Sequence, residues 1–379
     1  MVKILCVVGA RPNFMKIAPV MDALLHADPP FDARLVHTGQ HYDAAMNHQY
    51  FEALGIPAPD VNLEVGSASH AVQTAEIMRR FEPVLDAEQP AAVLVVGDVN
   101  STLACALVAA KKGVPVIHVE AGLRSFDRAM PEEINRVLTD QISDLLFTTE
   151  RGARDNLVRE GIDEARIHFV GNVMIDTLHR NLKKAVPAAQ TLSRAGLSGA
   201  VPAAGGYAVL TLHRPSNVDD AAKLVALLGA VGEISRRLPV VFPVHPRTRA
   251  KIEAFGLADR LPAETVWQLP PVGYLEMLGL MKDARLVLTD SGGIQEETTA
   301  LGVPCITLRN NTERPITAEE GTNTIVGQDP ARILAAFDDI MRNGGKAGRV
   351  PELWDGRASQ RIAEILRQWL DSGLQRRVA

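Results

Sequence analysis

The sequence is poor in aromatic residues, in cysteine, in long apolar runs and in charge of one sign. Aromatic side chains make up 4% of its 379 residues, too few for a surface that stacks nucleobases. No run of about 18 apolar residues occurs, so no segment is expected to span a membrane. Lys and Arg number 40 against 45 Asp and Glu, a net charge of −5, which argues against nucleic acid or a membrane surface as partner.

Cysteine chemistry is equally sparse. Cys6, Cys105 and Cys305 lie far apart, each inside an apolar run, and no C-x-x-C or zinc-type Cys/His spacing accompanies them. Buried thiols in a reducing compartment are therefore expected, with no metal and no cofactor. The first apolar run, MVKILCVVGA, is too short for a signal peptide and is followed by Arg11 and Lys16, so a cytoplasmic protein is expected.

Short β-branched runs alternate with longer helical patterns in the first half of the chain. Such a rhythm predicts a parallel sheet covered by helices on both faces. The predicted strands are Lys3–Val8, Ala33–Thr38, Ala92–Val96, Val116–Val119, Leu145–Thr148 and Ile167–Val170, and the predicted helices are Asn13–His26, His70–Ala87, Ser101–Lys112 and Pro131–Ile142.

The alternation of strand and helix patterns stops at Ala185–Gly206. This segment is rich in Ala, Ser, Pro and Gly, which indicates a connector. The alternation then restarts, so two doubly wound units in tandem are expected, followed by an amphipathic helix over Ser359–Leu374. The predicted strands of the second unit are Tyr207–Leu212, Val240–Pro243, Thr265–Leu269, Leu286–Thr289, Pro304–Leu308 and Thr324–Val326, with helices at Ala221–Arg237, Tyr274–Asp283 and Gln295–Leu301.

Polar residues follow many of these strands, where open parallel sheets bind their ligands. Acids gather after the strands of the first unit, and cations and glycines after those of the second. This division predicts a ligand cleft between two domains. The segments concerned are Gly9–Pro12, Gly97–Thr102, His118–Arg124, His213–Asn217, His245–Arg247, Asp290–Gly293 and Arg309–Pro315.

The most specific local motif for ligand binding begins at Asp290, at the end of a predicted strand. Ser291, Gly292 and Gly293 follow, and a predicted helix comes directly after them. Free N–H groups and the positive end of the helix favour a phosphate there. Glu297, one turn on, is placed to accept ribose hydroxyls. The alternative is a tight turn in which the Ser or Asp merely caps the helix.

The first turn, G-A-R-P, lacks the dinucleotide fingerprint G-x-G-x-x-G. It offers Arg11, with Lys16 about one turn into the helix; both could bind an anion or could be solvated cations. His213 and His245 follow apolar strands and could serve a ligand or be ordinary strand-end residues.

Carboxylates supply the remaining candidates. Asp98 and Glu120 lie at or just beyond strand ends, and Glu132 and Glu133 open a helix, where one of them is expected only to complement the helix dipole. Several carboxylates and a histidine near a phosphate site fit acid–base chemistry on a nucleotide-linked substrate. No D-x-D and no Walker lysine is present, so a metal-free site is expected.

Over nearly its whole length the chain resembles the non-hydrolysing UDP-N-acetylglucosamine 2-epimerases. The resemblance implies the GT-B architecture, two Rossmann-like domains with the active site in their cleft. It places the first domain at 1–184, joined by the C-terminal helix 359–379, the connector at 185–206, and the UDP-binding domain at 207–358. The matching motifs are GARPNFMKIAP, GDVNSTLA, HVEAGLRS, MPEEINR, VGNVMID, LHRP, PVHP, LTDSGGIQEE and TERP, in family order.

The family inverts C2 of the sugar without NAD, by losing UDP to form 2-acetamidoglucal and adding it back after protonation of the other face. The resemblance implies Asp98, Glu120 and Glu132 as acid–base carboxylates and His213 as the aid to the leaving diphosphate. It further implies a homodimer and a UDP-sugar as the partner. The implied binding residues are Arg11, Lys16, His245, Ser291, Gly292, Gly293, Glu297 and Arg314.

The chain also departs from the family. It reads GDVNST where many bacterial members read GDTTTT, and LHRPS where they read GHRRE. The activated bacterial members bind a second substrate through a Gln-His-Arg stretch and a later Arg. Here that stretch is Gln40–Asp43, and Val65–Ala71 contains no Arg, so weak or absent substrate activation is expected.

These departures leave four alternatives open. They are an epimerase of UDP-2,3-diacetamido sugars, a hydrolysing epimerase, a GT-B glycosyltransferase and a silent UDP-sugar-binding protein. The M-P-E-E acids and H-V-E favour an epimerase over a glycosyltransferase, and the presence of Asp98 and Glu120 argues against a silent binding protein.

Overall fold

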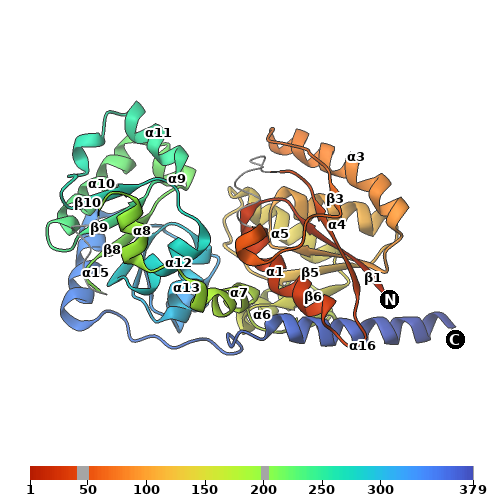
Figure 1. The fold of residues 1–379 in the computed structure, drawn as a ribbon. Helices are drawn as coiled ribbons and strands as arrows, with labels where there is room; N and C mark the ends of the chain where they lie inside the picture. Colours follow the sequence, from red (N-terminus) through yellow and green to blue (C-terminus); the bar gives the residue numbers. More distant parts are fainter. Residues whose placement is uncertain (41–50, 198–204, 379) are drawn as a thin grey trace. The chain divides into compact units, whose positions relative to one another are not determined.

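A computed structural model describes residues 1–40, 51–197 and 205–378. The chain forms two compact units (Figure 1). Unit 1 comprises Met1–Arg180 and Glu352–Ala379, and unit 2 comprises Asn181–Pro351.

Unit 1 contains a seven-stranded parallel sheet in the order β3-β2-β1-β4-β5-β6-β7. Chain order reverses direction between β1 and β4, which makes that pair the switch point of a doubly wound sheet. The strands are β1 Lys3–Val8, β2 Asp32–His37, β3 Val61–Asn62, β4 Ala92–Val96, β5 Val116–Ala121, β6 Leu145–Thr148 and β7 Ile167–Phe169.

Helices cover both faces of this sheet (Figure 1). Successive side chains of a strand point to opposite faces. Cys6 of β1 accordingly packs among residues of α1 and α16, whereas Val7 packs among residues of α3 and α4. The helices are α1 Arg11–Leu25, α3 His70–Glu88, α4 Asn100–Lys111, α5 Pro131–Ile142, α6 Arg151–Arg159, α7 Val173–Asn181 and α16 Ala358–Val378.

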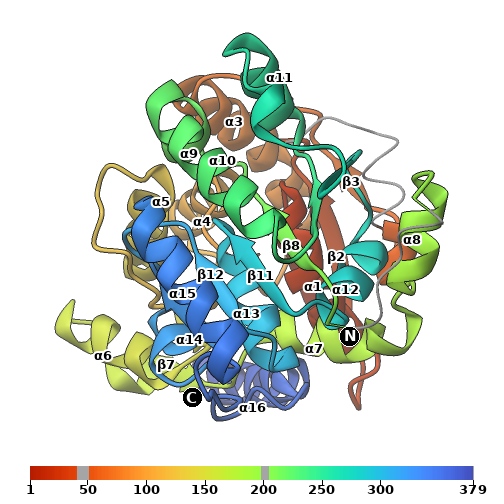
Figure 2. The same cartoon turned by 90° about the vertical axis from the view of Figure 1, so that its left-hand side faces the viewer.

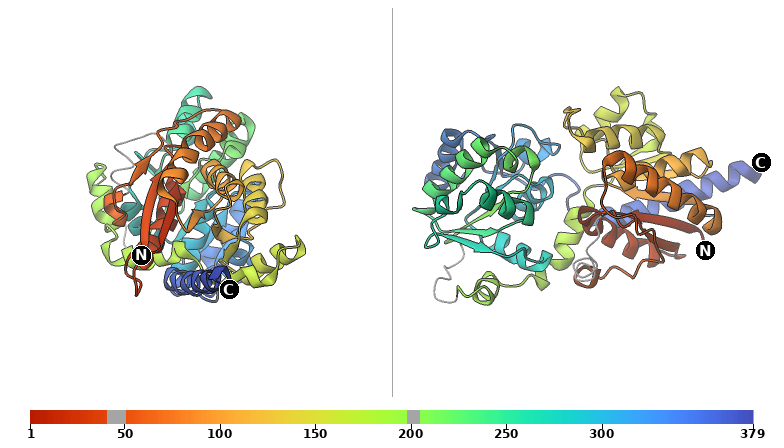
Figure 3. Two further views of the ribbon diagram at one scale, coloured as in Figure 1. Left: turned by 90° about the vertical axis from the view of Figure 1, so that its right-hand side faces the viewer. Right: turned by 90° about the horizontal axis from the view of Figure 1, so that it is seen from above.

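The last helix, α16, belongs to unit 1 although it follows unit 2 in the chain, and Figure 3 shows it from two further sides. Ile362 and Leu366 of α16 are fully buried in the same core as Phe14 and Ile17 of α1. Asp176 of α7 accepts the backbone N–H groups that open the helix, from Ala358 at 3.1 Å and Ser359 at 2.7 Å. Apolar burial and an N-terminal carboxylate therefore fix α16 on unit 1.

Unit 2 has the same doubly wound architecture. Its sheet has six parallel strands in the order β10-β9-β8-β11-β12-β13. Its switch point lies between β8 and β11. The strands are β8 Ala208–Thr211, β9 Val240–Pro243, β10 Val266–Leu269, β11 Leu286–Thr289, β12 Cys305–Thr307 and β13 Asn323–Ile325.

The second sheet is also covered on both faces. Leu210 packs among residues of α10 and α15, which lie in front of the sheet in Figure 2, and its neighbour Val209 packs among residues of α8 and α12. The helices are α8 Ala188–Arg194, α9 Pro215–Val218, α10 Ala221–Ser235, α11 Pro246–Ala254, α12 Tyr274–Lys282, α13 Gly292–Leu301, α14 Pro315–Glu319 and α15 Pro330–Asn343. The predicted pair of doubly wound α/β units is confirmed.

Several elements go beyond the sequence prediction. The short strand β3 and the helices α6, α7, α8, α9, α11, α14 and α15 were not expected. The segment expected to be a connector contains α8, whose Ala188 and Leu192 are buried beside Tyr207 in the core of unit 2. The Ala-rich composition of this segment gives no clear helical pattern, and α8 packs mainly against residues far away in the sequence.

The three cysteines are buried, as predicted, and burial raises the pKa of Cys6 and Cys305 to about 12. Within the described ranges no helix has the length and apolar character needed to cross a bilayer. The same ranges contain no group of three or more His, Cys, Asp or Glu residues arranged to hold a metal ion.

Candidate active site

The predicted site residues concentrate at the two switch points. In unit 1, Arg11 follows β1, Asp98 follows β4 and Glu120 lies near the end of β5. In unit 2, His213 follows β8 and Ser291 follows β11. Ligands of open α/β sheets bind at this position, so the topology supports both groups as binding sites.

Asp98 is held by helix α5. Its Oδ2 accepts a hydrogen bond of 2.6 Å from Nη2 of Arg136, and its backbone carbonyl accepts one of 2.9 Å from Nδ2 of Asn135. Its side chain is 21% exposed. Gly97 before it has φ +68°, a conformation that suits glycine. The sharp turn and the two α5 contacts present a partly exposed, oriented carboxylate at the strand end.

Glu120 occupies a β-bulge in β5. The register with β6 shifts between Val119 and Ala121, and Glu120 itself has φ 75°, which is unusual for a non-glycine residue. Bulges redirect a side chain, and here the carboxylate meets Nζ of Lys16 at 2.7 Å. Both side chains are buried, so the solvated-cation interpretation of Lys16 is wrong.

The structure distinguishes Glu132 from Glu133, and neither is shown merely to complement the helix dipole. Glu133 is buried, and its carboxylate accepts hydrogen bonds from Ser125 N and Oγ, Phe126 N and Arg136 Nη1. Those contacts fix the loop before α5. Glu132 is half-buried in the first turn of α5. Glu133 therefore has a structural role, and Glu132 remains the candidate for chemistry.

The first turn is organised by Asn13. Its Oδ1 accepts the backbone N–H groups of Gly9 and Ala10, and its Nδ2 donates to Val96 O at 3.0 Å. These bonds tie the end of β1 to the end of β4. Arg11, half-buried at the start of α1, is thereby held at the switch point of unit 1.

In unit 2 a buried carboxylate that the sequence analysis did not select, Asp290, orients His213. Asp290 Oδ1 lies 2.8 Å from Nδ1 of His213, and its oxygens accept the backbone N–H groups of His213 and Arg214 and the amide of Asn217. Burial alone would raise the pKa of Asp290, but the His213 charge and these hydrogen bonds hold it below its ordinary value.

This arrangement sets the direction of the His213 ring. The ring directs Nδ1 to Asp290, while the side chain is 37% exposed. A carboxylate on one imidazole nitrogen orients the ring for chemistry at the other. The position of Asp290, directly after a buried strand, was the signal that could have identified it.

Ser291 is the N-cap of α13 and Gly292 and Gly293 are its first two residues, so the helix begins at Gly292 and not at the predicted Gln295; the capping alternative is wrong. Ser291 occupies the N-cap position without a side-chain capping bond, and Asp290 is turned to residues 213–217 instead. The N-terminal N–H groups of α13 thus lack a side-chain cap from either residue. Gly292 is needed for close approach, since a Cβ there would lie 2.6 Å from Glu313 Oε1.

Glu297 is buried in α13. Burial raises its pKa to about 7, an effect that the Tyr274 hydroxyl opposes and neighbouring Glu296 reinforces. Its Oε1 has no hydrogen-bond partner among the described residues. A buried carboxylate oxygen without a donor is costly, and it is suited to accept a hydroxyl from a ligand.

Arg314 belongs to a buried ionic network that the sequence analysis found only in part. Its Nε lies 2.7 Å from Glu296 Oε1, and Glu313 lies 2.8 Å from Arg309 and 3.4 Å from Arg214. Burial would raise the pKa of Glu313, but the arginines hold it well below its ordinary value.

His245 caps α11, because its Nδ1 accepts the backbone N–H of Arg247 at 3.2 Å. Its exposed ring lies 5.6 Å, centre to centre, from that of His213. The structure therefore brings together the two histidines that the sequence placed after different strands.

The predicted division of charge between the units is wrong. Unit 1 pairs Glu120 with Lys16 and Asp98 with Arg136, and unit 2 pairs Arg314 with Glu296. Buried charges require partners, and each unit supplies its own.

Residues in the stretches that depart from the family motifs are hydrogen-bonded within unit 1. Ser101 Oγ lies 2.7 Å from Thr38 Oγ1 and donates to Gln40 Oε1 at 2.7 Å. Gln40 is thus buried and engaged in unit 1. His41, Tyr42 and Asp43, the rest of the stretch considered for a second substrate, lie outside the described residues.

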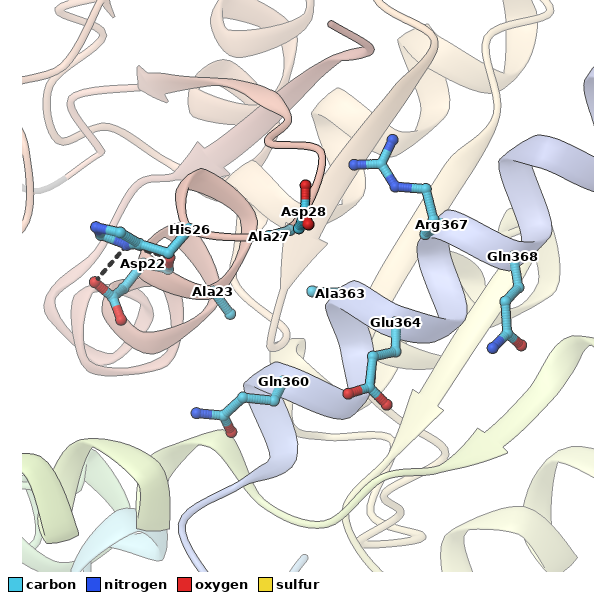
Figure 4. Close-up of a pocket in the computed structure, with 10 residues that line it drawn as sticks. All are labelled: Asp22, Ala23, His26, Ala27, Asp28, Gln360, Ala363, Glu364, Arg367 and Gln368. Carbon is cyan, nitrogen blue, oxygen red and sulfur yellow. Dashed lines mark hydrogen bonds and ion pairs between the residues drawn. The ribbon is translucent and has the colours of Figure 1, made fainter.

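Unit 1 also has two surface cavities. One, of about 440 Å³, is lined by Asp22 of α1, by His26 directly after α1, and by Glu364 and Arg367 of α16 (Figure 4). The other, of about 460 Å³, is lined by α3, the start of α4 and the first turns of α5. None of the predicted site residues lines either cavity.

Comparison with known proteins agrees with this description. The sequence model of the UDP-N-acetylglucosamine 2-epimerase family matches residues 23–367. The chain is 43% identical to the UDP-N-acetylglucosamine 2-epimerase of Methanocaldococcus jannaschii, over 96% of this chain and 98% of that protein. It is also 43% identical to the UDP-2,3-diacetamido-2,3-dideoxy-D-glucuronate 2-epimerase of Pseudomonas aeruginosa, over 96% and 99%.

Among solved structures, the Methanocaldococcus jannaschii UDP-GlcNAc 2-epimerase in complex with UDP-GlcNAc and UDP is similar with a TM-score of 0.88. It is 43% identical, and the match covers 97% of this chain and 99% of that one. The fold is therefore that of the UDP-GlcNAc 2-epimerases of the GT-B class. The chain belongs to the UDP-N-acetylglucosamine 2-epimerase family.

Proposed function

We propose that the protein interconverts UDP-N-acetylglucosamine and UDP-N-acetylmannosamine by elimination and re-addition of UDP. The observation that carries the proposal is the pair of switch points. One presents the carboxylates of Asp98 and Glu120, and the other joins the uncapped start of α13 to the Asp290–His213 pair.

In the proposed reaction, a carboxylate removes the proton from C2 of the sugar while the C1–O bond to UDP breaks. The C2–H electron pair forms the C1=C2 double bond of 2-acetamidoglucal, and the C1–O pair leaves with UDP. A proton then adds to the opposite face of C2 as UDP oxygen returns to C1. The atoms and electrons balance without an oxidant. Asp98, Glu120 and Glu132 are the proposed proton carriers, because opposite faces need separate acid–base groups.

Unit 2 is proposed to hold UDP. The Ser291 hydroxyl and the N–H groups of Gly292 and Gly293 are the proposed donors to the diphosphate, and a helix N-terminus stabilises the charge that builds up as UDP leaves. His213, oriented by Asp290, assists there, and Glu297 accepts the ribose hydroxyls. Arg11, Lys16, His245 and Arg314 are the remaining proposed substrate contacts.

Incubation with UDP-N-acetylglucosamine in D₂O tests the proposal. Deuterated UDP-N-acetylmannosamine is the expected product. Free N-acetylmannosamine would indicate a hydrolysing enzyme, and absence of C2 exchange without an acceptor would indicate a glycosyltransferase. Asp98→Asn and Glu120→Gln should each reduce exchange by about 100-fold or more. Normal exchange in either variant contradicts the role of that residue.

Asp144→Asn is the matched control. Asp144 Oδ2 accepts the N–H of Val116 at 2.9 Å, at the amino end of β5 and so away from the carboxyl ends. Its substitution should leave the rate of C2 exchange unchanged.

A second candidate substrate is the UDP-2,3-diacetamido sugar. The Pseudomonas aeruginosa relative that acts on the uronate form is as similar in sequence as the Methanocaldococcus jannaschii epimerase. Parallel D₂O incubations with both UDP-sugars, compared by kcat/KM, decide between them.

We further propose a homodimer. Val72 of α3 and Ile134 and Leu138 of α5 are large apolar side chains exposed by 55%, 41% and 46%. Ile134 and Leu138 are four residues apart and share one face of α5, and Ile134 also lines the cavity beside α3. A second copy of the chain is the proposed occupant of this face, as is usual for the family that the sequence resembles.

A further inference from the structure

A buried ion pair lies beneath the strand-end turns of unit 1 and takes no part in the proposed chemistry. It consists of His118 of β5 and Asp140 of α5, whose side chains are both fully buried. His118 Nδ1 lies 2.6 Å from Asp140 Oδ1. The contacts of these two residues lead in opposite directions, to the two turns that carry Glu120 and Asp98.

Asp140 spans the bulge at Glu120. Its Oδ1 meets His118, two residues before Glu120, and its Oδ2 accepts the N–H of Gly122, two residues after, at 3.1 Å. A non-glycine residue at φ 75° persists only when its surroundings hold it. The two oxygens of the Asp140 carboxylate thus contact the chain on both sides of the bulge.

His118 reaches the other turn. Its Nε2 lies 2.8 Å from the carbonyl oxygen of Gly97, the residue before Asp98. A carboxylate and a carbonyl only accept hydrogen bonds, so both contacts are satisfied when each ring nitrogen carries a hydrogen. One buried ring therefore joins Asp140 to the turn before Asp98.

The contacts of the pair continue to Arg124 and Glu160. Nη2 of Arg124 lies 2.7 Å from Asp140 Oδ2 and 2.6 Å from Glu160 Oε2. His118, Asp140, Arg124 and Glu160 thus form one chain of contacts in which each carboxylate has a hydrogen-bonding or ionic partner. A buried network of this kind fixes the positions of the backbone segments that it bonds.

We propose that His118 and Asp140 are positioning residues, which fix the turns of Asp98 and Glu120 relative to each other. The inference rests on the proposed function, because it takes these two carboxylates as the proton carriers. Both proton carriers must reach the same carbon atom, C2 of the sugar. A buried side chain that bonds both turns holds their two carboxylates at fixed positions for this proton transfer. Displacement by about 1 Å can lower a rate by about 100-fold.

Three substitutions of His118 separate positioning from simple structural support. His118→Phe fills the volume and removes both links. In His118→Gln the side-chain amide nitrogen lies near the place of Nε2 and can still donate to Gly97 O, whereas in His118→Asn it lies near the place of Nδ1 and keeps only the link to Asp140. His168→Phe is the matched control, since His168 lies in β7 of the same sheet and contacts the ring of Phe147.

The measurements are kcat and KM for C2 exchange in D₂O, with thermal unfolding for each variant. We expect kcat of His118→Phe to fall about 100-fold, with KM for UDP-N-acetylglucosamine within about 3-fold of the parent. His118→Gln should retain more activity than His118→Asn, whatever their order of thermal stability. His168→Phe should keep the parent kcat. If His118→Phe fails to fold, the Gln and Asn variants carry the test.

The positioning role is overturned if kcat of His118→Phe stays within about 2-fold of the parent, or if His118→Asn is as active as His118→Gln or more active. A parent enzyme that exchanges no C2 hydrogen overturns the proposed function itself. An active parent with an equally active His118→Phe overturns the positioning role alone.

Discussion

Replacement of Glu297 by Gln should stabilise the ligand-free protein and weaken its affinity for UDP. The carboxyl is buried, its pKa is raised from 4.5 to about 7, and its Oε1 has no hydrogen-bond partner among the described residues. The difference between 4.5 and about 7 corresponds to about 3 kcal/mol between the charged and neutral forms. Gln has nearly the same shape and carries no charge.

The sign follows from proton linkage. The folded protein holds the Glu297 proton more tightly than the unfolded chain, so the group's contribution to stability is present below pH 4.5 and lost as pH rises through about 7. Glu297→Gln should therefore match the parent near pH 4.5 and exceed it by up to about 3 kcal/mol at pH 8.

Urea unfolding between pH 4.5 and 8.5, followed by tryptophan fluorescence, measures this difference. Trp267 in β10 lies in the same unit as Glu297. A stability difference that does not change with pH would refute the reasoning. Glu296→Gln is the control: its carboxylate lies 2.7 Å from Arg314 Nε, so its loss should destabilise the protein instead.

The same variant tests the proposed ribose contact. Ligand hydroxyls that donate to Glu297 favour its charged form, so UDP affinity of the parent should rise between pH 6 and 8, as the carboxyl loses its proton. In Glu297→Gln, calorimetric titration should show weaker UDP binding and no such rise. A parent-like affinity in the variant would show that the ribose binds elsewhere.

Three further predictions concern unit 1 and the kinetics. Glu132→Gln should lower kcat by about 100-fold and leave thermal stability intact. Glu133→Gln should instead lower the unfolding temperature, because it disturbs four hydrogen bonds around residues 125–136. Equal unfolding temperatures of the two variants would contradict these separate roles. Ile134→Asp with Leu138→Asp should convert a dimer to a monomer in sedimentation, and an unchanged mass would place any interface elsewhere. Initial rates should depend hyperbolically on UDP-N-acetylglucosamine, and sigmoidal rates abolished by a second-site substitution would contradict the expected lack of activation.

Much of the fold was predictable because it is recorded in local patterns. Apolar runs of four to six residues marked Lys3–Val8, Ala92–Val96, Val240–Pro243 and Leu286–Thr289 as strands with the bounds that the structure shows. Buried parallel strands are apolar on both faces, so their pattern does not depend on distant residues. The short elements β3 and α8 carry no such signal, since their burial is decided by what packs against them.

The amino-acid sequence by itself determined the two doubly wound units, most of their strands, and which polar residues stand at the strand ends. The tertiary structure alone decided which charges meet. Lys16 pairs with Glu120 across 104 positions, and His213 with Asp290 across 77. Such pairs form because a buried charge needs a partner wherever the fold brings one, and spacing along the chain does not record that. The same holds for His118 and Asp140, which lie on different elements and meet only when α5 packs beneath the turns after β4 and β5.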